Sequence, residues 1–271
     1  MRSRPPARRP PTGLLAFAPV VLEDVPLRVD PAEVRAFQDY KPPRPLPPAE
    51  VAARLEAARR EIAGLVRPRL AYRTVGVTVA EPHRLTVEGG VRLHIPEIGR
   101  HWGPIEAVAV GLATIGEDPE HRVRARREAG DELGATLLDS AGSAAAECLA
   151  EWANDHLCQL GVAARLGVTN RISPGLAGWD LREQALLLRL CPAAEIGVRL
   201  GADGGLSPAK SILFLVGIGR AARVDHYFVQ CRRCWAAACP ARRMAAVTTV
   251  HRDQPSVPPT GEMAGEGETA G

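Results

Sequence analysis

The chain has 271 residues and a formal net charge of +3, and 46% of its residues are hydrophobic and 24% charged. This composition is typical of a folded globular protein, and the length suffices for one large domain or two small ones. The sequence shows neither a basic stripe for nucleic acid nor the run of about 18 apolar residues that a membrane helix needs. We therefore expect no nucleic acid and no membrane among its partners.

Both ends of the chain are predicted to be disordered. Residues 1–28 are rich in Arg and Pro, and their apolar run is interrupted by Pro19 and lacks a small-residue cleavage site, so an extension is favoured over a signal peptide. Residues 246–271 form the second tail, which leaves one domain over residues 29–245. All six Cys lie between Cys148 and Cys239, unlike a secreted disulfide framework. We expect a cytoplasmic protein.

Two helices are predicted before the first strand. The segment "DPAEVRAFQDYK" begins with Asp30 as the N-cap and has Pro31 in its first turn. Residues 41–48 form a stiff Pro-rich linker. The apolar stripe that follows predicts a longer amphipathic helix, which Pro68 ends.

Strands and further helices are predicted in the middle of the chain. Residues 72–95 have an apolar period near two with a turn at Gly89–Gly90, which indicates short strands. Residues 105–116 form a continuous apolar run, typical of a buried strand. Helices are predicted over residues 117–130, where acids lead, and over residues 133–160.

The second of these helices carries small residues from Ala141 to Ala146. They allow either close approach of a ligand or tight helix packing, and composition does not separate the two. A loop is predicted over residues 170–179, and a helix follows in which Asp180 and Glu183 have the spacing of a capping box. The last strand is predicted over residues 211–219.

The stretch "LGADGGLSPAKS", which ends at Ser211, is one residue short of a phosphate-binding loop, since Ala209 stands where that motif has Gly. A phosphate loop follows a strand and opens a helix. Here an aliphatic strand follows Lys210, and Pro208 removes one backbone N–H donor. We therefore predict a loop that faces a ligand or partner, and no nucleotide site.

The order of several motifs resembles the activation domain of cobalamin-dependent methionine synthase, especially its free-standing versions. The resemblance is carried by "EVRAFQDYK", "LVRPRLAYR", "LATIG", "LDSAGSAAAECLAE", "RISPGLAGWDLREQALLLRL", "AAEIGVRL", Pro208 and "AKSILF", between Asp30 and Arg243. It implies an α+β fold in which an antiparallel β-sheet is flanked by helices. It also implies binding of S-adenosylmethionine and docking on a corrinoid protein, where cob(II)alamin is reduced and remethylated.

The resemblance carries five residues over to a binding site for S-adenosylmethionine. They are Arg171, which matches the ligand-contacting Arg of the family, and the residues beside it or on the second loop: Ser173, Gly175, Leu176 and Asp203. A guanidinium presents paired donors to a methionyl carboxylate. The chain departs from the family at Leu176, where the family has Tyr, and at the second loop, where Gly201, Ala202 and Asp203 replace Thr, Glu and Ser.

Three other acids are candidates for the same site. Asp39 matches an acid that binds the methionyl ammonium in the full-length enzyme. Asp139 and Glu147 flank the small-residue helix and either face the ligand or are exposed helix acids, the second being favoured. No side chain is predicted to act as a catalytic residue, since the domain would work by positioning a sulfonium methyl against cobalt.

A cysteine cluster lies near the end of the predicted domain. Cys231, Cys234 and Cys239 occur in "CRRCWAAACPARR", and a Cys-x-x-Cys spacing suits one metal ion. An iron–sulfur cluster, a zinc ion and buried thiols all remain open. The fourth ligand of a metal would be Cys191, Cys158 or His226.

The sequence thus predicts reductive reactivation of a cobalamin-dependent methyltransferase of the methionine synthase type. The partners would be a cobalamin-binding methionine synthase or another corrinoid protein, and an electron donor such as a flavodoxin or ferredoxin. Two alternatives stay open: a docking subunit that has lost S-adenosylmethionine, and a metal or iron–sulfur protein that passes electrons.

Overall fold

A computed structural model of the chain describes residues 18–40, 48–176 and 178–224. Its elements, in chain order, are β1 (Val20–Leu22), α1 (Pro31–Tyr40), α2 (Pro48–Leu65), β2 (Arg69–Glu81), β3 (Arg84–Val87), β4 (Arg92–His94), α3 (Ile98–Trp102), β5 (Ala107–Thr114), α4 (Asp118–Glu128), α5 (Glu132–Ala163), β6 (Gly167–Val168), a 3₁₀ turn (Leu181–Glu183), α6 (Gln184–Leu190), a second 3₁₀ turn (Ala193–Ile196), β7 (Arg199–Leu200), β8 (Leu206–Ser207) and β9 (Ser211–Gly219).

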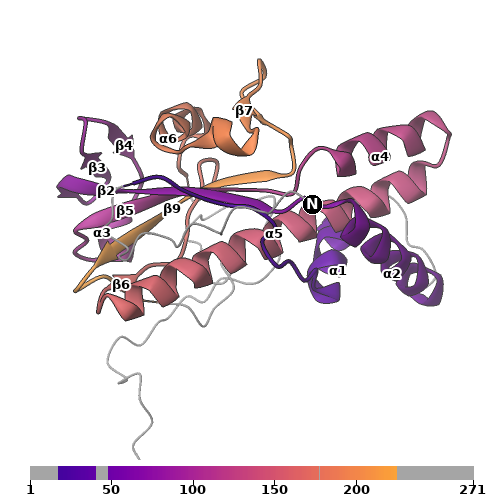
Figure 1. Ribbon diagram of the computed structural model, residues 1–271, viewed down its shortest axis with the longest axis horizontal. Helices are drawn as coiled ribbons and strands as arrows, with labels where there is room; N and C mark the ends of the chain where they lie inside the picture. The colour runs from indigo at the N-terminus through magenta and orange to yellow at the C-terminus, as the bar shows by residue number, and fades with distance from the viewer. Residues whose placement is uncertain (1–17, 41–47, 177, 225–271) are drawn as a thin grey trace, which may run out of the picture.

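The core of the fold is one antiparallel sheet in the order β4-β3-β2-β5-β9-β6, with β1 paired to the first part of β2. The helices α1, α2 and α5 contribute to a hydrophobic cluster on one face, and α3, α6 and the second 3₁₀ turn to a cluster on the other. Figure 1 shows α5 along one face and α6 on the opposite one. The predicted α+β fold with helices flanking an antiparallel sheet is therefore confirmed.

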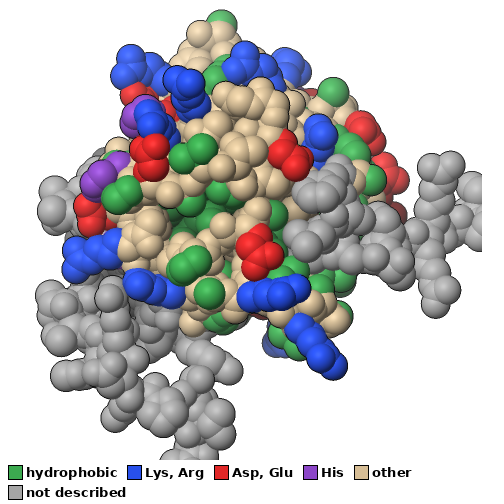
Figure 2. Space-filling model, turned by 90° about the vertical axis from the view of Figure 1, so that its left-hand side faces the viewer, with side chains coloured by type: hydrophobic (Ala, Val, Ile, Leu, Met, Phe, Trp, Pro, Cys, Tyr) green, Lys and Arg blue, Asp and Glu red, His purple; other side chains and the backbone are tan. Residues whose placement is uncertain are grey.

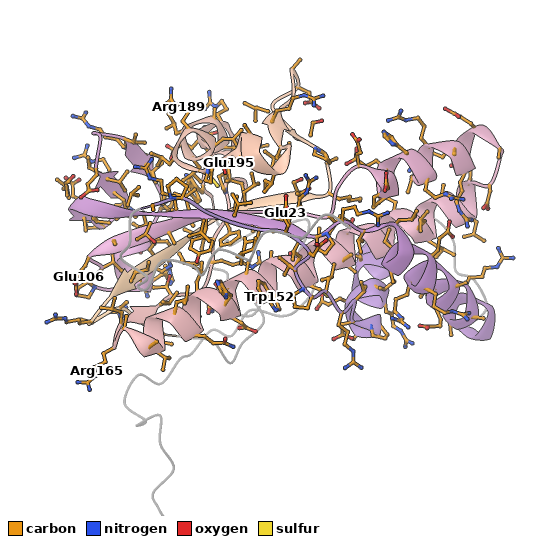
Figure 3. The ribbon with its side chains drawn as sticks, in the orientation of Figure 1. Glu23, Glu106, Trp152, Arg165, Arg189 and Glu195 are labelled. Carbon is orange, nitrogen blue, oxygen red and sulfur yellow. The ribbon has the colours of Figure 1, made fainter. Side chains whose placement is uncertain are left out.

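Both faces of the sheet are buried at its centre. Every residue of β5 is buried, which explains its continuous apolar run. Figure 3 places Arg189 and Glu195 on the α6 side of the sheet and Trp152 on α5. At the end of the molecule where β3, β4 and α3 lie, basic, acidic and histidine side chains alternate around apolar ones (Figure 2).

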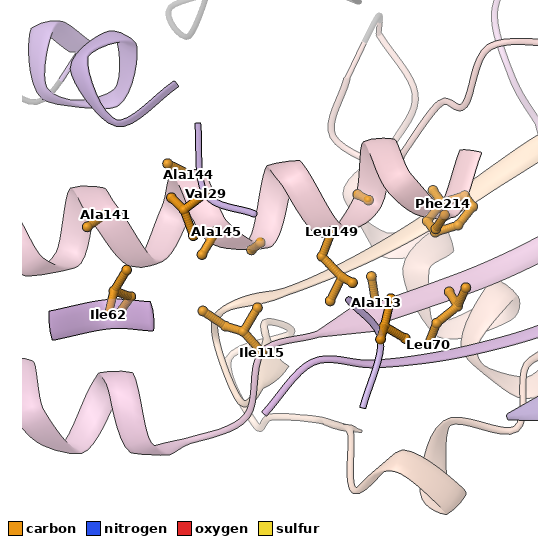
Figure 4. Packing of buried hydrophobic residues seen from close by; sticks show 14 of the residues in the cluster. Val29, Ile62, Leu70, Ala113, Ile115, Ala141, Ala144, Ala145, Leu149 and Phe214 are labelled. Atoms are coloured by element: carbon orange, nitrogen blue, oxygen red, sulfur yellow. The ribbon is translucent and has the colours of Figure 1, made fainter. Parts of the chain in front are cut away.

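The cluster under α5 depends on small residues. In Figure 4, Ala141, Ala144 and Ala145 of α5 lie close to Ile62 of α2 and to Val29, and all five side chains are buried. A side chain no larger than a methyl group lets these segments approach α5 closely. Tight packing therefore accounts for the small-residue stretch.

Two predicted helix caps are present. The carboxylate of Asp30 accepts a hydrogen bond from the Ala32 N–H at 2.8 Å and so caps α1. The carboxylate of Asp180 likewise accepts from the Arg182 N–H at 2.8 Å.

The capping box predicted for Asp180 and Glu183 is only half present. The Glu183 carboxylate accepts instead from the His94 backbone N–H at 2.9 Å and from Trp179 Nε1 at 2.8 Å. It thereby joins the start of α6 to β4, a contact between residues distant in the sequence.

The amino-terminal boundary of the domain also differs from the prediction. The strand β1 lies within residues 1–28, for which the sequence predicts a disordered extension, and Val20 pairs with Tyr72 of β2. The folded part therefore begins before residue 29. The boundary between residues 245 and 246 lies outside the described residues. None of the described helices combines the length and apolar character that crossing a bilayer requires.

Candidate functional site

The loop that carries Arg171 starts at the edge of the sheet, beyond β6. Ile172 forms an antiparallel bridge with Leu215 of β9, with backbone hydrogen bonds of 2.8 and 2.9 Å. The side-chain oxygen of Asn154 on α5 accepts from the Arg171 N–H at 2.9 Å. The loop is thus fixed to the sheet on one side and to α5 on the other.

The turn in this loop depends on a glycine. Gly175 has φ 87°, a left-handed conformation that favours residues without a side chain. Its N–H donates to the Trp179 carbonyl at 2.8 Å, which closes the loop over residues 175–179. Gly175 is exposed, so its backbone is open to contact from outside.

The Arg171 side chain is buried, with 4% of its surface exposed. Its Nη2 atom donates to Glu147 Oε1 at 2.5 Å and to Glu151 Oε1 at 2.7 Å. Burial opposes the charged form, but the charges of Glu147 and Glu151 outweigh it, and the pKa of Arg171 is raised above its ordinary value. The guanidinium therefore stays charged and held in place.

Glu147 is therefore not an exposed helix acid, contrary to the favoured expectation. Its side chain is only 16% exposed, and it faces the predicted ligand contact Arg171. Asp139, two turns earlier on α5, accepts from Lys210 Nζ at 2.6 Å. That ammonium also donates to Ser143 Oγ at 2.8 Å.

These four positions define a polar stripe on α5, formed by Asp139, Ser143, Glu147 and Glu151. They are spaced four residues apart, so they share one face of the helix. Lys210 holds the first two and Arg171 the last two. The spacing of these four residues can be read from the sequence, but Lys210 and Arg171, which bind them, come from segments distant in the sequence.

Ser173 offers a second polar group beside Arg171. Its Oγ atom is buried and has no hydrogen-bond partner among the described residues. A buried hydroxyl without a partner is costly, so this oxygen is suited to contact a bound molecule. Leu176 is partly exposed on the same loop.

The second predicted loop forms a small hairpin between β7 and β8. Gly201 N–H donates to the Gly205 carbonyl at 2.7 Å, and the carboxylate of Asp203 accepts from the Gly205 N–H at 3.0 Å. Gln184 Nε2 donates to the Gly204 carbonyl at 2.9 Å and ties the hairpin to α6. Asp203 is exposed and supports its own turn. The strand β9 follows at Ser211, so the context of a phosphate loop is absent here.

Two of the proposed fourth metal ligands, Cys158 and Cys191, lie within the described residues. Burial raises the pKa of both Cys158 and Cys191 to about 12. Within the described ranges, no three or more Cys, His, Asp or Glu side chains are arranged to hold a metal ion. The predicted metal site lies outside those ranges, with Cys231, Cys234, Cys239 and the candidate ligand His226.

The acid predicted to bind the methionyl ammonium, Asp39, falls within α1, but its side chain is not described.

Comparisons with known proteins identify the fold. Neither a family model nor a curated protein matches the sequence. A solved structure described as the MetH reactivation domain bound to AdoHcy is similar, with a TM-score of 0.53 and 12% sequence identity. The match covers 81% of this chain and 83% of that chain. This likeness shows a shared α+β fold.

Proposed function

We propose that this protein binds S-adenosylmethionine at the Arg171 loop and reactivates a cobalamin-dependent methyltransferase of the methionine synthase type. The corrinoid would be held by a partner, either a methionine synthase or another corrinoid protein. The proposal is carried by a buried guanidinium between two carboxylates, on a fold shared with a domain bound to AdoHcy.

The residues of the loop fit the polar part of this ligand. An amino-acid group carries one carboxylate and one ammonium, and the site offers the guanidinium of Arg171 and the carboxylate of Glu147. The buried Ser173 Oγ lacks a partner among the described residues, and Gly175 leaves its backbone accessible. We assign Leu176 and Asp203 to the rim of the site.

The protein would act by binding and orientation. When bound, S-adenosylmethionine would supply a methyl cation to cob(II)alamin that takes up one electron from a flavodoxin- or ferredoxin-type donor. The products would be methylcobalamin and S-adenosylhomocysteine. Arg171 would fix the amino-acid end of the ligand, so that its sulfonium end faces the partner. Holding two reactants in the correct relative orientation lowers the entropic part of the activation barrier.

The direct test reconstitutes the reaction. The purified chain is mixed with a corrinoid protein in the cob(II)alamin state, a one-electron donor and S-adenosylmethionine, and methylcobalamin absorbance and S-adenosylhomocysteine are followed. We expect equal amounts of both products, and neither when the chain is omitted. Product formation that does not depend on the chain would reject the activity.

The second candidate function is that of a docking subunit that does not bind S-adenosylmethionine. It is favoured by the same ion pairs, since Arg171 is already satisfied by two carboxylates of its own chain. Such a subunit would bind the corrinoid protein with unchanged affinity in the presence and absence of S-adenosylmethionine.

We also propose that Cys231, Cys234 and Cys239 bind a metal ion or cluster that serves as an electron entry point. The expected result is close to one zinc ion, or several iron atoms with visible absorbance, per chain by elemental analysis of anaerobically purified protein. The Cys234→Ser variant should lose that metal, whereas Cys148→Ser, a change at a cysteine of α5 that is not a proposed ligand, should keep it. Wild-type protein that is free of zinc and iron after anaerobic purification would contradict the site.

A further inference from the structure

The two carboxylates on Arg171 are held very differently. Both accept from the same atom, Nη2, at 2.5 Å for Glu147 and 2.7 Å for Glu151. The Glu147 side chain is 16% exposed, whereas that of Glu151 is 54% exposed. One carboxylate is therefore an inner partner of the guanidinium, and the other an outer partner in contact with solvent.

This difference makes Glu151 the partner that can be exchanged. Moving Glu147 would leave a carboxylate buried beside an altered guanidinium, which is strongly unfavourable. Moving Glu151 returns a half-exposed carboxylate to water and leaves Arg171 paired with Glu147, which costs less than breaking the buried pair. A guanidinium also binds any carboxylate with the same donor geometry, so another carboxylate can take the place of Glu151 with little net loss.

We propose that Glu151 is a specificity-determining residue that occupies Arg171 until a ligand brings its own carboxylate. The inference rests on the proposed binding of S-adenosylmethionine and adds which residue the ligand must displace. A ligand with a carboxylate restores the second interaction of Nη2 when Glu151 leaves. A ligand without one leaves that interaction unmade, so it has no means of displacing Glu151.

The other ion pair on the polar stripe does not have this character. Lys210 and Asp139 are 13% and 25% exposed, and the ammonium also binds Ser143 Oγ. Both partners are therefore largely shielded from solvent. This pair ties α5 to the segment before β9. On the polar stripe, Glu151 is therefore the carboxylate that a ligand can displace.

The test compares two ligands on three proteins by titration calorimetry. The ligands are S-adenosylmethionine and its decarboxylated analogue, and the proteins are the wild type, Glu151→Gln and Asp155→Asn. Asp155 lies one helical turn beyond Glu151 and is exposed, so Asp155→Asn removes the same charge nearby without touching Arg171. We expect Glu151→Gln to bind S-adenosylmethionine about three- to fivefold more tightly, the range set by the loss of an exposed ion pair.

The same variant should bind the decarboxylated analogue no more tightly than the wild type does, and Asp155→Asn should tighten neither ligand. Unchanged or weaker S-adenosylmethionine binding by Glu151→Gln, beside a wild type that binds, would overturn the role of Glu151 and leave the proposed function standing. Equal tightening of both ligands, or tightening in Asp155→Asn, would also overturn it. Absence of binding to wild type and Glu151→Gln alike would reject both.

Discussion

Replacing Gly111 by alanine should destabilise the protein by about 3 kcal/mol, the upper part of the range for overpacked cores. Gly111 lies on β5 opposite Phe214 of β9, and Phe214 is fully buried. A Cβ atom at position 111 would lie 2.2 Å from Cζ and 2.5 Å from Cε2 of that ring. Both strands are held in register at the centre of the sheet, so the ring has to shift. Chemical denaturation measures the change in the free energy of unfolding.

A matched control is available in α2. A Cβ atom at Gly64 would meet nothing within 4 Å, and alanine is favoured over glycine in a helix by about 1 kcal/mol. Gly64→Ala should therefore leave the protein equally or more stable. Adding Phe214→Leu to Gly111→Ala should recover part of the lost stability, because the smaller side chain makes room for the new Cβ atom. Equal stability of Gly111→Ala and wild type would contradict the packing of β5 against β9.

Replacing Arg171 by glutamine should cost about 3 to 5 kcal/mol of stability, the usual loss when one partner of a buried ion pair is removed. The change leaves Glu147, which is only 16% exposed, without its cation. The Arg171 backbone N–H still donates to Asn154, so the loop itself remains attached to α5. Thermal and urea unfolding provide the measurement.

The double variant Arg171→Gln with Glu147→Gln separates the ion pair from the rest of the loop. It removes the stranded charge, and we expect it to regain most of the lost stability. Arg182→Gln serves as the control, since Arg182 is 90% exposed and pairs with Asp180 at the surface. A single Arg171→Gln variant as stable as Arg182→Gln would show that the guanidinium is not buried against Glu147.

Local patterns in the sequence predicted most of the elements and not their contacts. The cap at Asp30, the end of α2 before Pro68 and the buried run of β5 follow from the residues themselves. The strand β1 was missed because three residues carry no period and form a strand only by pairing with β2. The single long strand β2 was predicted as shorter ones.

In the candidate site too, the sequence indicates the residues but not the contacts between them. The resemblance points to Arg171 and Ser173, and the burial of the Arg171 side chain and of Ser173 Oγ follows from the place of the loop between the sheet edge and α5. The ion pairs of Arg171 join residues 24 and 20 positions apart in the sequence, and no local rule connects them. Glu183 was expected to bond within its own turn, but the nearby indole of Trp179 and the backbone of β4 provide partners that a local capping pattern does not include.

Binding of S-adenosylmethionine at Arg171 is tested by a calorimetric titration of the purified chain, with the folded double variant Arg171→Gln, Glu147→Gln as the comparison. We expect micromolar binding to the wild type, and binding at least 100-fold weaker (about 3 kcal/mol) to the double variant, since two charge-assisted hydrogen bonds are lost. Equal affinity of the two proteins would place the ligand away from Arg171. No heat of binding to a folded wild type would contradict the S-adenosylmethionine site and favour the docking subunit.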